Sequence, residues 1–139
     1  MALSEMNYSG GGSGLTPKTL WTNQSPTSDF SSGTVTLDTG KFSDYDYIKI
    51  IFKSEASGNL MSLIWEESEF EKLKLIGTDT ASGTQAGMLT MVTSSSGVYR
   101  WRSFKYISDT SIQFGNARKS DNTTNYNAYI LPQEIIGLK

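Results

Sequence analysis

The 139-residue chain contains neither cysteine nor histidine. Without cysteine there is no disulfide framework and no thiolate metal site. Without histidine the commonest general base and metal ligand is missing. We therefore expect no metal and no cofactor, and we predict that the chain is not an enzyme.

The chain also lacks strong charge and long apolar runs. Its formal net charge is −2, so it has no basic footprint for nucleic acid. Its apolar runs extend over only a few residues, far short of the roughly 20 that a membrane-spanning helix needs. No basic region followed by an apolar run marks a secretory signal at the start. We expect neither a nucleic-acid partner nor a membrane partner.

Serine, threonine and aromatic residues are abundant. The chain has 20 Ser and 15 Thr, and 12% of its residues are aromatic, a composition that favours strands and turns. The clearest strand is Tyr45–Ser54, in which Ile48, Ile50 and Phe52 share one face and lysines keep the other face wet. Such a strand needs a second layer to cover it. The sequence therefore predicts one all-β domain over residues 15–139, an antiparallel β-sandwich or jelly-roll-like fold of eight or nine strands.

Short alternating or apolar runs supply the other strands: Lys18–Thr22, Thr34–Leu37, Leu60–Glu67, Gly87–Ser94, Gly97–Ser108, Thr110–Phe114, Tyr126–Leu131 and Glu134–Lys139. The apolar run Leu60–Glu67 is expected to be buried on both faces and to form a hairpin with the central strand. Phe70–Ile76 is expected to be a charged edge strand, and Gly115–Asn125 a surface loop. Pro132 is expected to break a strand, and a bulge is expected near Ser103.

A glycine-rich leader, residues 1–14, precedes the predicted sandwich. Its run Gly10–Gly14 has the composition of a flexible linker. It is not a phosphate loop, because no Gly-Lys-Ser/Thr closes it and no strand precedes it. Leu3, Met6 and Tyr8 are apolar points, and the segment is either a short docking peptide or disordered.

Carboxylates are densest in one stretch that contains Glu66, Glu67, Glu69 and Glu71. A glycosidase needs two carboxyl groups about 5 to 10 Å apart across a sugar, but a solvated face balanced by Lys72 and Lys74 is the favoured interpretation. Asp79, Asp109 and Asp121 offer loop oxygens for Ca²⁺ without EF-hand spacing, so we predict no metal site.

Aromatic side chains give a stronger signal, because sugar rings pack on them while neighbouring polar groups bond the hydroxyls. The aromatic residues considered are Trp21, Trp65, Tyr99, Trp101, Tyr106, Tyr126 and Tyr129. Most are expected in the core or at a subunit interface. Arg100 and Arg102 alternate with Trp101 and are expected on an exposed strand face or as interface anchors. The candidate ligand-binding residues are Tyr99, Arg100, Trp101, Arg102, Asn125 and Tyr126.

Several short motifs occur in a suggestive order: Leu20–Phe30, Tyr45–Ile50, Tyr99-Arg100, Ser111–Gly115 and Ile135–Lys139. In this order they resemble a small β module of bacteriophage virion proteins. That module often forms the C-terminal end of tail-fibre or minor structural proteins in phages and prophages of Gram-positive bacteria. The resemblance covers about residues 18–139.

The resemblance implies a β-sandwich that assembles on the virion, commonly as a homotrimer, after synthesis in the bacterial host cytoplasm. It implies a role in virion assembly and receptor binding at the host surface, with other virion proteins and host cell-surface glycan as partners. A head or tail decoration protein fits the same resemblance. Residues 1–14 would then tether the sandwich to the virion. A free-standing carbohydrate-binding module is the alternative function, and a glycan hydrolase is the third.

Overall fold

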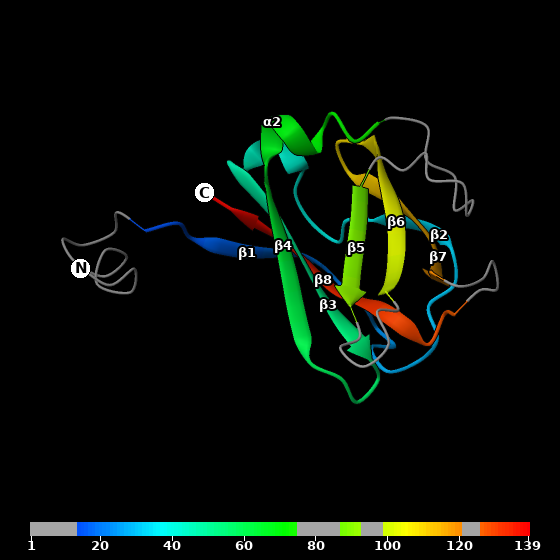
Figure 1. Cartoon of the computed structure of the whole chain (residues 1–139). Coiled ribbons are helices and arrows are strands. Elements are labelled where there is room, and N and C mark those ends of the chain that lie inside the picture. Colours follow the sequence, from blue (N-terminus) through cyan, green and yellow to red (C-terminus); the bar gives the residue numbers. More distant parts are fainter. Residues whose placement is uncertain (1–13, 75–86, 93–98, 121–125) are drawn as a thin grey trace.

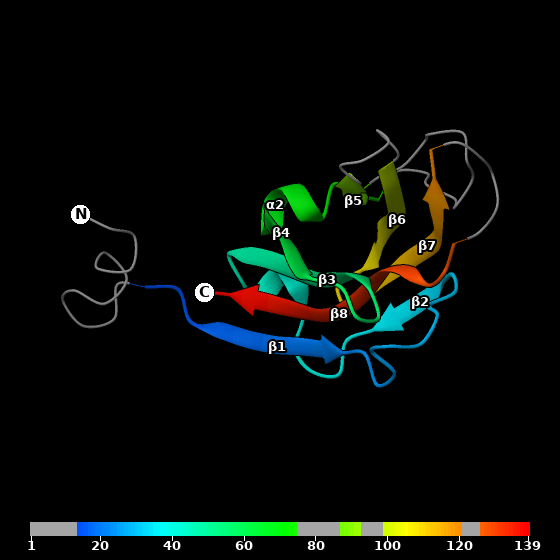
Figure 2. The ribbon, with the colours of Figure 1, turned by 60° about the horizontal axis from the view of Figure 1, so that its bottom comes forward.

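The computed structural model describes residues 14–74, 87–92, 99–120 and 126–139. The described strands are β1 (Pro17–Thr22), β2 (Gly33–Thr36), β3 (Tyr47–Glu55), β4 (Leu60–Glu66), β5 (Gly87–Val92), β6 (Tyr99–Ser108), β7 (Ser111–Lys119) and β8 (Tyr129–Leu138). They form two antiparallel sheets with the strand orders β1-β8-β3-β4 and β2-β7-β6-β5. These sheets, here called the first and second sheet, make the two layers of a sandwich (Figures 1 and 2). The predicted all-β sandwich of eight or nine strands is confirmed, with eight strands in the described residues.

The central position predicted for β3 is also confirmed. It is an inner strand of the first sheet, between β8 and β4. Ile48 and Ile50 are fully buried and Phe52 is 2% exposed, so the apolar face points into the sandwich. The opposite face is half-buried from Tyr47 to Lys53 and exposed at Glu55. The alternation of β3 therefore sets which of its faces meets the second sheet.

Aromatic rings fill the end of the sandwich where two short helices lie. The helices are the 3-10 helix η1 (Phe42–Asp44) and the single turn α2 (Glu67–Phe70). The Phe42 and Phe70 ring centroids are 5.0 Å apart, and Phe70 lies 6.0 Å from Phe104 of β6. Offset and edge contacts of this kind add to the energy of burial. Both short helices are thereby fixed to the second sheet.

The predicted strand at Phe70–Ile76 is wrong over its described part. Residues 67–70 form α2, and residues 71–74 continue as turns. The Glu71 N–H donates to the Glu67 carbonyl at 3.0 Å. Phe70 and Leu73 are three residues apart, so a helical turn directs both against the core, whereas a strand would place them on opposite faces. Among the described residues, no helix has the length and hydropathy to cross a bilayer.

Three further boundary expectations are corrected. The strand β4 pairs with β3 as predicted, but it is an edge strand with exposed apolar residues and is not buried on both faces. Residues 115–119 extend β7 and do not form a loop. Pro132 does not break β8, because it lies beside the register shift where Ile51 pairs with Glu134 and Phe52 with Pro132. A bulge tolerates a proline that an ordinary inner-strand position would not.

The bulge expected near Ser103 is found at that point of the β6–β7 ladder, but on β7. Arg102 pairs with Ala117 and Phe104 with Phe114, so β7 carries the extra residue. Arg102, Phe104 and Tyr106 are buried at every second position of β6, and Trp101 and Ser103 between them are buried as well. Arg102 therefore occupies an inward position in β6.

Candidate functional site

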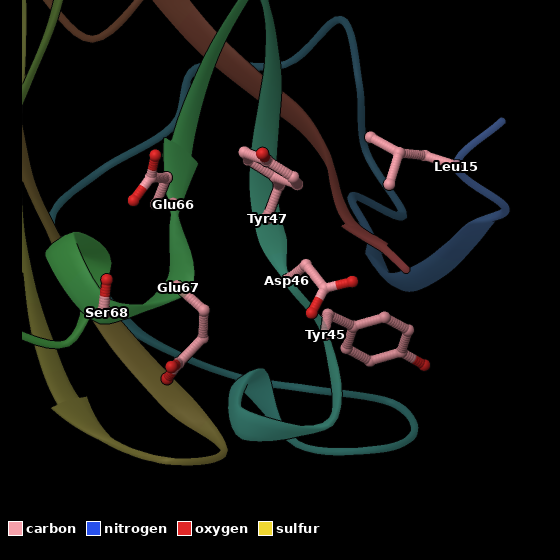
Figure 3. Close-up of a pocket in the computed structure, with 7 residues that line it drawn as sticks. All are labelled: Leu15, Tyr45, Asp46, Tyr47, Glu66, Glu67 and Ser68. Carbon is pink, nitrogen blue, oxygen red and sulfur yellow. The ribbon is translucent and has the colours of Figure 1, made fainter. Parts of the chain in front are cut away.

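A hollow of 590 Å³ lies where β3 begins and β4 ends. We call it the acidic hollow. It is lined by Leu15, Tyr45, Asp46, Tyr47, Glu66, Glu67 and Ser68 (Figure 3). Three carboxylates and two tyrosine rings thus surround one open space, and among the described residues no basic side chain lines it.

The backbone around the acidic hollow is fixed by strand pairing. Tyr47 lies opposite Glu66 in the antiparallel ladder between β3 and β4. The Glu67 N–H donates to the Asp46 carbonyl at 2.8 Å, and the Asp46 N–H donates to the Leu138 carbonyl at 2.9 Å. Side chains that project from paired strands are held more precisely than side chains on loops. The hollow is therefore preorganised by the first sheet.

The ring of Tyr45 forms one wall because residue 137 is glycine. A Cβ at Gly137 would lie 2.4 Å from the Cγ of Tyr45, closer than any real contact. The ring thus lies directly against the β8 backbone and is half-buried there. Glycine is required at this position because the ring and the backbone approach so closely.

The carboxylates of the hollow differ in exposure. Asp46 and Glu66 are exposed, whereas Glu67 is half-buried and its Oε1 has no contact with solvent and no hydrogen-bond partner within the described ranges. Burial raises the pKa of Glu67, and the nearby charges of Glu71 and Asp109 raise that pKa further. In Figure 3 the Glu66 carboxylate and the Tyr47 ring project from neighbouring strands and stand apart, and the Glu67 carboxylate points away from both. Asp46 and Glu66 are thus the acceptors most open to a ligand.

The other glutamates of this stretch have a different role. Glu69 contacts Lys72 at 2.9 Å and Glu71 contacts Lys74 at 3.7 Å, and all four side chains are exposed. The predicted solvated face balanced by lysines is confirmed for these two pairs. Among the residues that the structure describes, no cluster of three or more acidic side chains is arranged to hold a metal ion.

Arg102, a predicted ligand-binding residue, is completely buried. Its guanidinium donates to the carbonyls of Ile130 at 2.7 Å, Gly115 at 2.7 Å and Tyr129 at 3.0 Å. The expectation of an exposed strand face is therefore wrong for Arg102. The side chain bridges β6 to β8 of the other sheet, because the carbonyls there replace the water that it gives up.

The remaining predicted site residues fall into two contacts. The Arg100 guanidinium lies 3.7 Å from the centre of the Tyr129 ring, and the Tyr126 ring is 6.3 Å from that same ring. Tyr99 is 43% exposed and its ring lies 5.3 Å from Trp101, which is only 9% exposed. Asn125 and residues 1–13 of the predicted leader lie outside the described residues. None of the predicted ligand-binding residues that the structure describes lines the acidic hollow.

Sequence reasoning missed the acidic hollow, although two signals for it were present. The run Tyr45-Asp46-Tyr47 begins the central strand, and Glu66-Glu67 ends its predicted hairpin partner. Antiparallel pairing brings the start of one arm to the end of the other. The predicted hairpin therefore contained the site.

Comparisons of the chain with protein-family models, with curated proteins and with solved structures found no match. Function must accordingly be argued from the side chains of the hollow.

Proposed function

We propose that this chain is a structural protein of a bacteriophage virion that attaches to host-surface glycan through the acidic hollow. One observation carries the attachment role, namely that Tyr47 and Glu66 lie opposite each other on paired strands and both line the acidic hollow. The virion part of the proposal depends on the resemblance of the turn and core motifs to phage modules.

The chemistry of the hollow suits a neutral or cationic sugar. A tyrosine ring offers its face to the C–H groups of a pyranose. The exposed carboxylates of Asp46 and Glu66 accept hydrogen bonds from hydroxyl groups or from an amino group, and bonds to charged acceptors are the stronger ones. An anionic ligand is disfavoured, because three carboxylates already share the space.

The alternative is a free-standing carbohydrate-binding module that uses the same hollow without a virion. The rigid β-sandwich and the open aromatic wall support it equally. Immunogold labelling of phage particles from a strain that encodes the chain separates the two functions. Labelled particles support the virion role, and unlabelled particles support the free module.

The attachment role is tested by binding of the fluorescently labelled full chain to purified cell-wall glycans of Gram-positive bacteria. Tyr47→Ala and Glu66→Gln should each weaken binding by about tenfold or more, as loss of a stacking ring or of a charged acceptor does. Tyr99→Ala is the matched control, because Tyr99 is an exposed ring outside the hollow. If Tyr99→Ala removes binding while Tyr47→Ala does not, the hollow is not the site. If no glycan binds, the attachment role is wrong.

A further inference from the structure

The strand β4 forms an outer edge of the first sheet. No strand within the described ranges pairs with this edge, since β4 ends the first sheet. The opposite edge, β1, carries Pro17, Lys18 and a register shift between Thr19 and Trp21. Prolines, lysines and bulges are the usual means by which an edge strand avoids pairing with another chain. The seven residues of β4 contain none of these, and its ladder with β3 has no shift.

The same strand exposes apolar side chains. Leu60 is 65% exposed, Ile64 54% and Leu63 39%. A second hollow of 300 Å³ lies on the outer face, lined by Lys49, Ile51, Leu60, Met61 and Ser62. An exposed apolar patch along a free sheet edge is characteristic of an interaction surface for another strand.

We propose that β4 pairs in antiparallel fashion with β4 of a second copy of this chain, about a two-fold axis at Leu63. A two-fold axis perpendicular to the sheet keeps outward residues outward. It must therefore lie midway between one residue and the same residue of the second copy, so that this residue faces its own copy. Centring on Leu63 overlaps all seven residues, Leu60 through Glu66. Leu63 then meets its own copy, and Leu60 of each chain lies opposite Glu66 of the other. The two first sheets become one continuous sheet.

Charge complementarity favours a second copy as the occupant. The end of β4 at Glu66 belongs to the acidic hollow, whereas Leu60 at the other end pairs with Lys53. Antiparallel pairing therefore brings Glu66 of one copy to within two strand spacings of Lys53 of the other, about 10 Å between Cα atoms. The long side chains of lysine and glutamate span that distance. A parallel arrangement would instead place like charges together.

This interface does not depend on the proposed function. It is also a different assembly from the homotrimer that the phage resemblance predicts, because a two-fold edge pair closes as a dimer. The same measurement of mass separates the two arrangements.

Analytical ultracentrifugation of the full chain across the micromolar range tests the proposal. Ile64→Lys should weaken dimerisation by about tenfold or more, since it places a charge in the paired face. The control is Ile107→Lys, a change of the same kind at a residue that is 46% exposed at the far end of β6. It should leave the dimer intact, and circular dichroism should show both variants folded. A monomeric wild type, a trimer, or equal effects of the two variants would overturn the proposal.

A charge exchange tests the register. Glu66→Lys and Lys53→Glu should each weaken the dimer, and the double variant should recover at least part of the loss. A double variant no tighter than the weaker single variant would rule out pairing centred on Leu63. Crosslinking of Leu63→Cys to itself provides a second readout, since the chain has no other cysteine. A disulfide-linked dimer supports the Leu63 axis, and its absence under oxidising conditions contradicts it.

Discussion

Two regions of this sandwich depart from the usual distribution of side chains in opposite ways. At β6 a charged Arg102 is fully buried, while at β4 Leu60 and Ile64 are more than half exposed. Buried charge and exposed apolar surface are the informative exceptions in a globular protein. Carbonyl groups inside the chain compensate the buried charge, whereas the apolar side chains at the edge of β4 stay exposed.

The hydrogen bonds of Arg102 also hold a strained part of the β8 backbone in place. Ile130, whose carbonyl accepts from the Arg102 Nε, has a φ of 48°. A β-branched residue rarely adopts this left-handed conformation, which costs of order 1 to 3 kcal/mol. Burial lowers the pKa of Arg102 to about 9, which leaves the guanidinium charged at neutral pH. One side chain thus fastens β8 in a conformation that its own sequence disfavours.

The largest effect is expected from Arg102→Met, which keeps the length of the side chain and removes its donors. Two buried carbonyls and one partly buried carbonyl would lose their partner and Ile130 would lose its restraint, so the free energy of unfolding should fall by about 3 kcal/mol or more. Urea unfolding measures it. The control is Arg100→Met on the same strand, which removes a half-buried guanidinium stacked on Tyr129 and should cost about 1 kcal/mol. Equal losses in the two variants would show that the bridge at Arg102 has no special weight.

The same contrast explains what could be predicted from the sequence. The apolar face of β3 could be predicted because Ile48, Ile50 and Phe52 alternate without interruption. The burial of Arg102 could not be predicted, because its acceptors include the carbonyls of Tyr129 and Ile130, 27 and 28 residues away. The local sequence pattern alone places an arginine on the solvent-exposed face of a strand. Only the tertiary fold supplies the carbonyls that allow it inside.

The candidate site was half predictable for a similar reason. The β3–β4 hairpin was expected, and its register alone brings Tyr47 to Glu66. The remaining wall, Tyr45 over Gly137, depends on β8 pairing with β3 from the far end of the chain. The edge position of β4 was missed because an apolar run has the same pattern in a buried strand and in an interface strand.

A smaller loss of stability is expected from Gly137→Ala, which changes the wall of the acidic hollow where the Tyr45 ring packs against β8. The new Cβ would meet the Tyr45 ring at 2.4 Å, so the ring or the β8 backbone must move, at a cost of about 1 to 3 kcal/mol. Thermal unfolding of the variant measures this cost. Gly33→Ala is the matched control, because nothing lies within 4 Å of its new Cβ. If Tyr45→Ala fails to reduce the cost of Gly137→Ala, the ring contact is not its cause.

The pH dependence of the free energy of unfolding gives a further test of the inward face of β6, because Tyr106 shares that face with Arg102. Burial first, and then the charges of Asp109, Glu71 and Glu67, raise the pKa of Tyr106 from 10.0 to about 12. Between these values the folded state keeps a proton that the unfolded state has lost, so the contribution of Tyr106 to the free energy of unfolding should fall as pH rises from 10 to 12. Burial of Arg102 acts with the opposite sign above pH 9, because there the unfolded state binds more protons. Tyr106→Phe removes only the falling contribution, so the free energy of unfolding of the variant relative to wild type should rise between pH 10 and 12 in urea unfolding. A difference that does not change with pH would exclude an effect of Tyr106.

The smallest effect is expected at Glu67, where α2 follows the exposed edge strand and a carboxylate is only partly covered. Burial and the neighbouring carboxylates raise the pKa of Glu67 above 4.5, so the folded state favours its neutral form. The stability from that protonated form is present below pH 4.5 and is lost as pH rises through the raised pKa. Glu67→Gln stays neutral throughout and should be more stable than wild type at pH 7, by less than about 0.5 kcal/mol because water screens this partly exposed group. The advantage should disappear below pH 4.5.

Glu69→Gln provides the control of opposite sign, because it breaks an exposed pair with Lys72 and should not stabilise the chain at any pH. A Glu67→Gln variant less stable than wild type at pH 7 would mean that this carboxylate has a partner that compensates its burial.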